Sequence, residues 1–498
     1  MTKSKIEANT VEAVEAGHDH EEKGLVPNVL WDTRYYSAEE TRLLRKIDLV
    51  LIPMLLIAYG IQFLDKVVLG YSATYGLITD LGLVGQQYSW SSSIFYFGYL
   101  FWEYFGIYLL RYFPAPRYLG VIMILWSVVT MLISTTTNFA GLAAIRFILG
   151  MLESVVAPSF LLIVAGWYKR SEQPIRQVMW FLGTPVFGFI GALVSYGLGH
   201  ATDTSVPPWK LLFLVLGSLG ILVGVVLFFF LPSSPREAWF LNEDEKQLAQ
   251  ARLAGDSITI SHNWKWYQVR EAFCDPKTYF FFLIALVGAL PGGGLSNFQT
   301  LLLETLVANK SPLYATLMTL PGFSVEIVSM VLCGFIATKI ENTALYIMSF
   351  CCVPAVIGTA LVHALPKSNT WGRIIGLWLI YAQASTLSVS FSVVSKNVSG
   401  YSKKSTVAAV TFVGYCVGSI AAPQFFKSTQ SKAGYPEGID MMLITLCIVL
   451  VLPLGLRAYL MWENRRRDKA RLPGEDFSET FVLADETDFE IKGFRYKL

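Results

Sequence analysis

The sequence has few charged side chains for its length. Asp, Glu, Lys and Arg make up 15% of the 498 residues, while hydrophobic residues make up 54%. Because an average soluble domain is about 25% charged, this composition excludes an ordinary soluble enzyme. The formal net charge of +2 gives no indication of nucleic-acid binding.

Motifs that would supply catalysis or energy coupling are also missing. No phosphate-binding Gly-x4-Gly-Lys-Ser/Thr motif occurs, which argues against an ATP-driven pump. The six cysteines show no Cys-x-x-Cys spacing and fall mostly in apolar stretches, so we interpret them as small packing residues. No His or Cys cluster falls inside an apolar stretch. We therefore predict no enzymatic activity, no cofactor and no metal site.

The chain contains many long apolar segments. A helix rises about 1.5 Å per residue, so about 20 residues cross a hydrocarbon core about 30 Å thick. The sequence predicts an all-α membrane protein with twelve transmembrane helices. The predicted spans are residues 47–64, 90–110, 119–133, 139–167, 178–198, 211–231, 279–303, 313–338, 344–364, 374–394, 407–426 and 441–459.

Positive charge predicts which side of the membrane holds the termini. An even number of spans puts both termini on one side, and Lys and Arg near span ends are retained in the cytosol. Few of the 39 basic residues fall on the face opposite the termini, namely Lys210, Lys310, Lys367, Arg373, Lys427 and Lys432. We therefore expect cytosolic termini. We expect the first span to be an uncleaved anchor, because the polar residues before it do not resemble a signal peptide.

A polar stretch in the middle of the chain divides the spans six and six. We expect a cytosolic N-terminal tail, a six-helix bundle, a cytosolic central loop, a second six-helix bundle and a cytosolic C-terminal tail, at residues 1–46, 47–231, 232–277, 278–462 and 463–498. Both tails are polar with little periodic apolar content, so we expect them to be disordered.

A helix-breaking stretch lies near the middle of the seventh span. Pro291 is followed by three glycines at residues 292–294. Such breakers are tolerated in membrane helices chiefly beside a cavity or a moving joint, so we interpret the stretch as an interruption that acts as a hinge. Close packing of helices at the glycines is the alternative.

Charged residues inside the apolar runs are the most informative feature. By the predicted bounds, Asp65 and Lys66 lie at the outer end of the first span. Arg146 lies in the outer half of the fourth span, and Glu153 follows seven residues later, on nearly the same helix face. A charge at bilayer depth costs several kcal/mol, roughly 3 by insertion scales, so these residues are expected to line a water-filled cavity or a substrate path.

Each charged pair has a functional and a structural interpretation. The Arg146 guanidinium offers a bidentate fork to an anion, and Glu153 could carry a proton that responds to the nearby charge. The alternative is a fixed Arg–Glu brace between helices. For Asp65 and Lys66 the alternative is a pair that marks the membrane interface, with Lys66 reaching outward.

Uncharged polar residues inside the spans are further candidates to hydrogen-bond a substrate, although interhelical hydrogen bonds are the alternative. They are Gln62 in the first span, Asn297 and Gln299 in the seventh, and Gln383 and Ser385 in the tenth. Glu326, in the eighth span, is a third intramembrane carboxylate and a candidate proton site.

Several stretches carry a family resemblance. R-F-I-L-G-M-L-E-S-V-V-A-P at residues 146–158 resembles the anion:cation symporter family of the major facilitator superfamily. L-D-K at residues 64–66, D-P-K-T at 275–278 and A-P-Q at 422–424 resemble its fungal allantoate permease subgroup. Ser419 stands where relatives often carry Asn, so it is a further candidate ligand contact.

The resemblance implies a function. It implies proton-coupled import of a small organic anion such as allantoate, ureidosuccinate, a small peptide or a vitamin, by two bundles that rock around a central site. Lys66 and Arg146 would be anion ligands, and Asp65 and Glu153 would be proton carriers. The expected partners are this substrate, protons and the lipid bilayer of the plasma membrane, with a monomeric chain. The alternative is a nutrient sensor that shares the fold without net transport.

Overall fold

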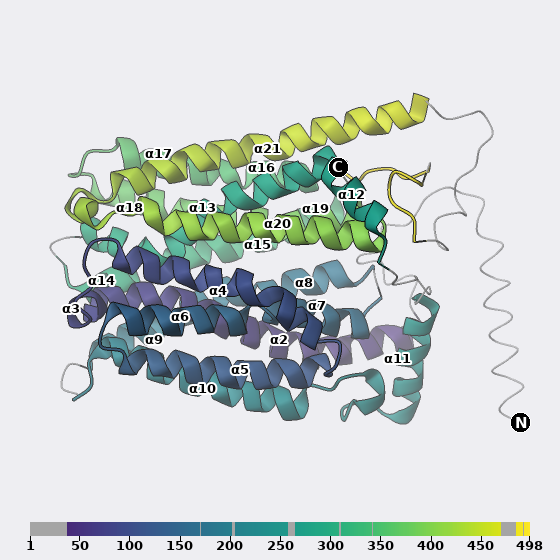
Figure 1. Ribbon diagram of the computed structural model, residues 1–498, viewed down its shortest axis with the longest axis horizontal. Helices are drawn as coiled ribbons and strands as arrows, with labels where there is room; N and C mark the ends of the chain where they lie inside the picture. Colours follow the sequence, from purple (N-terminus) through teal and green to yellow (C-terminus); the bar gives the residue numbers. More distant parts are fainter. Residues whose placement is uncertain are drawn as a thin grey trace, which may run out of the picture.

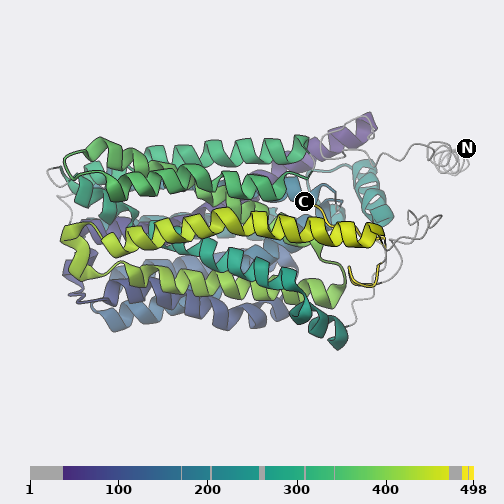
Figure 2. The same ribbon diagram turned by 90° about the horizontal axis from the view of Figure 1, so that it is seen from above.

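The computed structural model describes residues 37–169, 171–201, 205–256, 264–307, 310–340, 342–469, 485–491 and 493–498. These residues form long helices that run along one common axis (Figures 1 and 2). The helices before residue 232 occupy the lower part of Figure 1, and those from α12 onward the upper part. We call these the first half and the second half.

The first half is built from α2 and the helices that follow it. They are α2 (Ala38–Ser72), continued by a π-helical turn (Ala73–Leu77) and α3 (Ile78–Asp80), then α4 (Gln87–Leu109), α5 (Ala115–Leu132), α6 (Phe139–Glu153), α7 (Val156–Trp167), α8 (Gln173–Phe181), α9 (Gly183–Gly199) and α10 (Pro208–Phe230). A bridging helix, α11 (Glu243–Asp256), follows.

The second half repeats this plan. Its helices are α12 (Trp266–Cys274), α13 (Pro276–Leu306), α14 (Pro312–Leu317), α15 (Leu320–Lys339), α16 (Ala344–Phe350), α17 (Cys352–Ala364), α18 (Thr370–Ile380), η5 (Tyr381–Gln383), α19 (Ala384–Asn397), α20 (Tyr401–Ala421), η6 (Ala422–Phe425), η7 (Ser428–Ala433) and α21 (Pro436–Lys469).

The predicted all-helical fold with twelve spans is confirmed. Within the described residues, ten helical stretches are long and apolar enough to cross a membrane. The other two spans are α4 and the stretch from α18 to α19, which follow the remaining predicted segments. α2 begins and α21 ends at the same end of the bundle, on the right of Figure 1. We call this the terminal end, and the opposite end the far end.

The first span is longer than predicted, which changes the position of its charged pair. α2 does not stop at residue 64 but runs to Ser72, and a kink at Tyr75 and Gly76 joins it to α3, which ends at Asp80. Lys66 therefore lies well inside a candidate span of 43 residues. The expectation that Asp65 and Lys66 lie at the outer end is wrong, because partners on other helices satisfy their charges and the helix has no reason to end there.

The fourth span is divided where one span was predicted. Asn138 caps α6 by accepting a hydrogen bond from Gly141 N, and α6 ends at Glu153. Pro158 lacks the amide N–H that would bind the Ser154 carbonyl, so it favours a break one turn earlier. Glu153 thus lies at the joint between α6 and α7.

Close packing of α4 and α6 sets the position of the charged residues between them. A Cβ on Gly98 would lie 2.0 Å from the Phe147 carbonyl oxygen, and one on Gly150 would lie 1.9 Å from the Phe95 carbonyl oxygen. No other residue type allows the two backbones to approach this closely. Phe95 is consequently pressed against the face of α6 that carries Arg146.

The seventh span is not interrupted in this conformation. α13 continues as a helix through Pro291 and the three glycines, so the expected break is wrong here. A Cβ on Gly293 would lie 3.0 Å from Ala422, and one on Gly294 would lie 2.8 Å from the Phe426 ring. A Cβ on Gly292 would meet nothing within 4 Å. Close packing therefore accounts for two of the three glycines.

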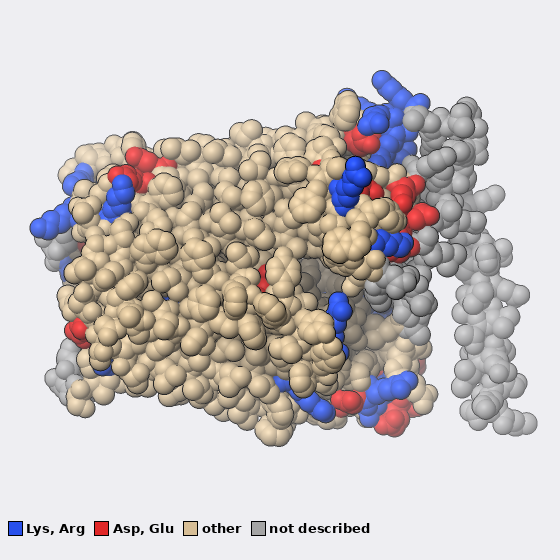
Figure 3. Space-filling model, in the orientation of Figure 1, with Lys and Arg blue, Asp and Glu red and all other residues tan. Residues whose placement is uncertain are grey.

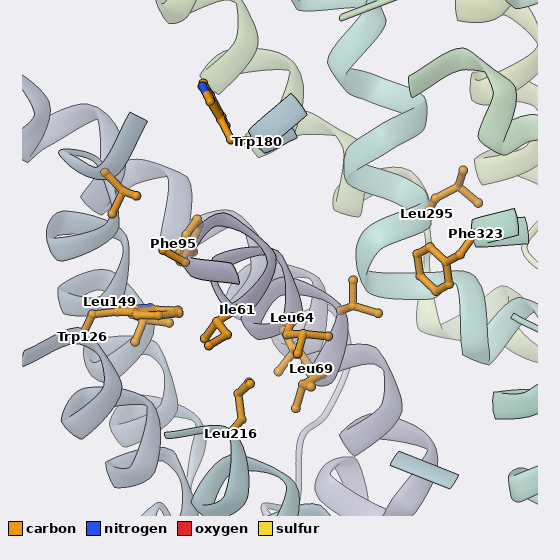
Figure 4. Packing of buried hydrophobic residues seen from close by; sticks show 14 of the residues in the cluster. Ile61, Leu64, Leu69, Phe95, Trp126, Leu149, Trp180, Leu216, Leu295 and Phe323 are labelled. Carbon is orange, nitrogen blue, oxygen red and sulfur yellow. The ribbon is translucent and has the colours of Figure 1, made fainter. Parts of the chain in front are cut away.

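Apolar packing surrounds the second part of α2, from Gly60 to Ser72. Figure 4 shows Ile61, Leu64 and Leu69 of α2 among buried side chains of both halves, including Phe95, Trp126, Leu149 and Leu216 of the first half and Leu295 and Phe323 of the second. α2 is thus a central helix, and polar residues on it are held inside the protein.

The two halves are joined at the far end. Tyr71 hydrogen-bonds Thr319 at 3.3 Å, and Tyr75 hydrogen-bonds Thr316 at 2.9 Å. Ser93 Oγ donates to the Ile420 carbonyl oxygen at 2.7 Å. Figure 3 shows the face of the molecule hollowed between the halves toward the terminal end. The bundle is therefore closed at the far end and open toward the terminal end.

Part of the C-terminal tail is ordered. α21 extends to Lys469, and residues 485–491 and 493–498 pack against the terminal end of the second half. The expectation of disorder is wrong for these residues, because their charged and aromatic side chains find buried partners there. Residues 1–36 of the N-terminal tail and residues 470–484 lie outside the described residues.

Candidate functional site

Lys66 and Glu153 form the central ion pair. Lys66 Nζ lies 2.7 Å from Glu153 Oε1, across the contact between α2 and the joint of α6 and α7. Gln62, one turn before Lys66 on the same face of α2, donates from Nε2 to the same oxygen at 3.0 Å. Glu153 is completely buried. A buried carboxylate needs such charged partners, because an unpaired one costs several kcal/mol.

Asp65 and Arg146 form a second pair on a different face of α2. Arg146 Nη1 lies 3.5 Å from Asp65 Oδ2, and Arg146 Nε donates to the Ser91 carbonyl oxygen at 3.4 Å. Thr130 of α5 donates to the other oxygen of Asp65 at 3.4 Å. The two pairs are therefore crossed: each acidic residue binds the basic residue of the other helix rather than the one near it in sequence.

The two basic residues differ in access to solvent. The Lys66 side chain keeps 17% of its surface exposed midway along the bundle, whereas the Arg146 side chain keeps 2%. The Phe95 ring lies 4.9 Å from the Arg146 guanidinium carbon and 5.7 Å from Lys66 Nζ. Arg146 is thus enclosed by Asp65, Ser91 and Phe95. Lys66 is the more accessible of the two cations.

Two acceptor atoms beside Lys66 have no hydrogen-bond partner among the described residues. They are Gln62 Oε1 and Glu153 Oε2, both buried. With the four charges in balance, the site combines one partly exposed ammonium group with two unused acceptors. This combination matches the chemistry of an anion that also carries N–H or O–H groups.

The polar candidates of the second half lie in contacts between helices. Gln383 Nε2 donates to the Gly288 carbonyl oxygen at 2.8 Å, close to Pro291 on α13. Ser385 Oγ lies 2.8 Å from Ser329 Oγ. Ser419 is buried, with its Cα 3.4 Å from the position of a Cβ on Gly293. The structure therefore gives these three residues interhelical roles.

Asn297 and Gln299 lie nearer the far end. Asn297 Nδ2 donates to the Gly293 carbonyl oxygen at 3.1 Å. The backbone carbonyl oxygen of Asn297 accepts from the Tyr88 hydroxyl of the first half at 2.8 Å. Gln299 lines a small cavity with Thr319 and Trp378. Among the described residues, no hydrogen bond joins Asn297 or Gln299 to Lys66.

Glu326 is buried on α15 of the second half, beside α9 of the first. It has no role in the crossed pairs.

Sequence reasoning missed several residues of the site. Thr130, Ser91 and Phe95 complete the surroundings of Asp65 and Arg146, and nothing in the sequence links them to those residues. Glu103, a half-buried carboxylate on α4, was also not singled out. A carboxylate inside the second apolar run was a signal that could have found Glu103. Within the described residues, no group of three or more His, Cys, Asp and Glu could hold a metal ion.

Comparisons with known proteins define the class. The Major Facilitator Superfamily model matches residues 55–423. An uncharacterized transporter of Schizosaccharomyces pombe is 35% identical over 94% of this chain and 89% of its own length. Allantoate permease of Saccharomyces cerevisiae is 32% identical over 93% of this chain and 87% of its own length. A thiamine pathway transporter of Saccharomyces cerevisiae is 30% identical over 93% and 88%.

The chain belongs to the Major Facilitator Superfamily and is a multi-pass membrane transporter. It groups with fungal transporters that include allantoate permease, which confirms the predicted subgroup. A bacterial homolog of the human lysosomal transporter Spinster, solved in an inward-facing and occupied conformation, matches with a TM-score of 0.58. It is 18% identical over 85% of this chain and 98% of that chain, so it supports the fold alone.

Proposed function

We propose that this protein imports a small organic anion together with a proton, by alternating access, across the plasma membrane. The observation that carries the proposal is the Lys66 ammonium group, whose side chain stays partly exposed inside an apolar span while it pairs with Glu153. A cation at this depth costs free energy, so its presence indicates a functional site. We assign to it the binding of an anion.

Charge balance supports coupling to a proton. The two crossed pairs together are neutral, so a carboxylate that binds Lys66 brings an unbalanced negative charge into a poorly solvated site. A proton on Glu153 removes that charge and frees the Lys66 ammonium group for the substrate. Loading an anion with a proton therefore keeps the site neutral in both states.

The unused acceptors narrow the substrate class. A carboxylate bound to Lys66 would place neighbouring N–H groups within reach of Gln62 Oε1 and Glu153 Oε2. Ureido acids such as allantoate and ureidosuccinate carry both groups, and allantoate permease is among the relatives. Small peptides and carboxylated vitamins share this chemistry in part.

Roles for the other candidate residues follow from their positions. Arg146 and Asp65 act as a buried pair that holds α6 against α2, so they position Glu153 and Lys66 rather than touch the substrate. Glu326 lies between the halves. Asn297, Gln299, Gln383, Ser385 and Ser419 shape the opposite wall through their helix contacts.

Alternating access and topology complete the proposal. With the far end closed by contacts such as Tyr75 to Thr316, the hollow opens toward the terminal end. We assign this end to the cytosol, with the central loop and both tails, because most Lys and Arg residues lie there. The two six-helix bundles rock about the crossed pairs in a single chain.

Reconstitution into liposomes tests the proposal. Wild-type protein should accumulate radiolabelled ureidosuccinate or allantoate when the outside is acidic, and a proton ionophore should abolish accumulation. Lys66→Gln should lower uptake about tenfold or more, since a charge-assisted hydrogen bond is worth about 1.5–3 kcal/mol. Lys46→Gln is the matched control, because Lys46 lies on the same helix as Lys66 but pairs with Glu245 of α11. Unchanged uptake by Lys66→Gln would refute the assignment.

A further inference from the structure

The C-terminal segment, residues 485–498 without 492, inserts a carboxylate into the second half. Asp488 is completely buried, and its Oδ1 lies 2.8 Å from Lys403 Nζ, while Lys277 binds its Oδ2. The Lys403 and Lys277 side chains are 0% and 1% exposed. Asp275 pairs with the same two lysines at 3.0 and 3.2 Å. These lysines begin α20 and α13, so one carboxylate links the starts of two spans.

Aromatic rings of the segment close this pocket. The Phe489 ring lies 3.7 Å from Lys403 Nζ, and the Tyr496 ring lies 3.8 Å from Lys277 Nζ. The Tyr496 hydroxyl donates to Asp488 Oδ2 at 2.8 Å. A ring face attracts an ammonium group more strongly when water is excluded. The pocket therefore has its full set of partners only with the segment in place.

Further bonds tie the segment to helix ends. Asp485 Oδ1 accepts from Tyr401 N at 2.7 Å, where α20 begins. Arg467 of α21 donates to the Asp488 carbonyl oxygen at 2.8 Å, and Asn397 of α19 accepts from Lys497 N at 2.8 Å. Thr487 donates to Glu271 of α12 at 3.0 Å. All these partners belong to the second half.

The helix that the segment binds diverges from the first half. Contacts between α4 and α20 include Ser93 with Ile420, Tyr96 with Tyr415 and Tyr99 with Phe412. They pass from the far end to the middle of both helices, whereas α20 begins at Tyr401, at the terminal end where Figure 3 shows the hollow. Closing this end must bring the start of α20 toward the last turns of α4.

We propose that the starts of α12, α13 and α20 form a binding surface for the chain's own acidic C-terminal segment, and that docking there holds the two halves apart at the terminal end. With the segment docked, the starts of α13 and α20 share bonds with α12, α19 and α21 and move as one body. Once the segment leaves, the start of α13 and the start of α20 can each bend toward the first half separately. The inference concerns conformation and requires no assumption about the substrate.

The charge on Asp488 supports a bond that persists in the cell. Burial alone would raise the pKa of Asp488, but the ammonium groups of Lys277 and Lys403 lower it overall. The carboxylate is thus ionised at neutral pH. Asp488→Asn removes the charge while keeping the shape, and Asp488→Glu keeps the charge.

Two measurements on the purified full chain test the proposal. Docking is followed by the disulfide yield between cysteines at Ser399 and Glu486, because Ser399 Oγ donates to the Glu486 carbonyl oxygen at 2.9 Å. Opening is followed by the spin-label distance between cysteines at Tyr108 and Ser405, both exposed, near the end of α4 and the start of α20. The remaining native cysteines are replaced in all variants.

Asp488→Asn should lower the disulfide yield at least twofold and shift the distance distribution toward its shorter population. Asp488→Glu and the far-end control Asp440→Asn should match the parent protein. Undiminished disulfide formation, or release of the segment with unchanged distances, would overturn the proposal. Should Asp488→Asn fail to fold, a protease site placed within residues 470–484 allows the segment to be removed from folded protein. The distances after removal then decide in the same way.

Discussion

Lys66 of α2 binds Glu153 at the joint of α6 and α7, at 2.7 Å, although Asp65 is its neighbour in sequence. The pair places the more accessible cation of the site in direct contact with a buried carboxylate. In the mechanism proposed above, a proton on Glu153 releases Lys66 for the anion, so proton and substrate load together. The first two predictions separate this pair from the one behind it.

Glu153→Gln should uncouple transport from the proton. The amide mimics the protonated carboxyl group, so substrate can still bind Lys66, but no proton is taken up or released. Proteoliposomes should retain exchange of internal for external substrate and lose accumulation driven by a pH gradient. Glu437→Gln, at the exposed far end where Glu437 pairs with Lys427, is the control. Continued pH-driven accumulation by Glu153→Gln would show that another carboxylate carries the proton.

Arg146→Lys should affect stability more than substrate affinity. The ammonium group loses the bond to the Ser91 carbonyl oxygen and the broad contact with the Phe95 ring, which together cost about 1–3 kcal/mol. The thermal unfolding midpoint in detergent should fall by several degrees. The half-saturating substrate concentration should change less than about twofold. A large loss of affinity at an unchanged midpoint would make Arg146 a substrate ligand instead.

The three glycines of α13 should respond differently to alanine. Gly294→Ala places a Cβ 2.8 Å from the Phe426 ring and should destabilise the protein by about 1–3 kcal/mol. Gly292→Ala meets open space and should stabilise the helix by up to about 1 kcal/mol. Thermal midpoints check both. If α13 bends at this point during transport, Gly292→Ala will also slow maximal uptake at matched protein level. An unchanged rate would dismiss the hinge.

Tyr75→Phe should loosen the far end. It removes hydrogen bonds to Thr316 at 2.9 Å and to the Ser195 carbonyl oxygen at 3.2 Å. A loss of about 1 kcal/mol should raise the far-end-open population about fivefold. A cysteine at Ser89, which is buried there, reports opening through faster labelling by an impermeant maleimide. Tyr108→Phe, on the exposed Tyr108–Tyr112 pair, should leave the labelling rate unchanged.

Docking of the C-terminal segment should not depend on pH near neutrality. The pKa of Asp488 is lower in the docked state than in the free segment, so its contribution is present above the free value and is lost as pH falls through the docked one. The protein is equilibrated at different pH values and then oxidised briefly at one fixed pH. The Ser399–Glu486 disulfide yield should be the same after equilibration anywhere between about pH 6 and pH 8. A loss of yield on mild acidification within this range would show that another group controls docking.

The features that the sequence predicts are those that local chemistry determines. Apolar runs of sufficient length define the spans, and the cost of charge in lipid singles out Lys66 and Arg146 among the basic residues. The break after Glu153 also has a local signal, because Pro158 follows it within the same apolar run. In these cases a residue's own neighbours along the chain carry the information.

Pairing between helices could not be predicted in the same way. Which acid binds Lys66 depends on how α2 is rotated against α6, and that rotation follows from close approach at Gly98 and Gly150. The C-terminal segment resembled a disordered tail because its partners, Lys277 and Lys403, lie far away in sequence. The polar composition of a segment gives no information on buried charged residues of other helices that can bind it.

The crossed pairing also constrains how this site can evolve. Neutralising Lys66 together with Glu153, or Asp65 together with Arg146, removes one pair and leaves the other intact. Neutralising the sequence neighbours Asp65 and Lys66 also conserves net charge, but it strands a buried acid and a buried base whose partners are gone. Compensating substitutions should therefore appear between helices rather than within the Leu-Asp-Lys stretch, with strong epistasis between positions 66 and 153 and between 65 and 146.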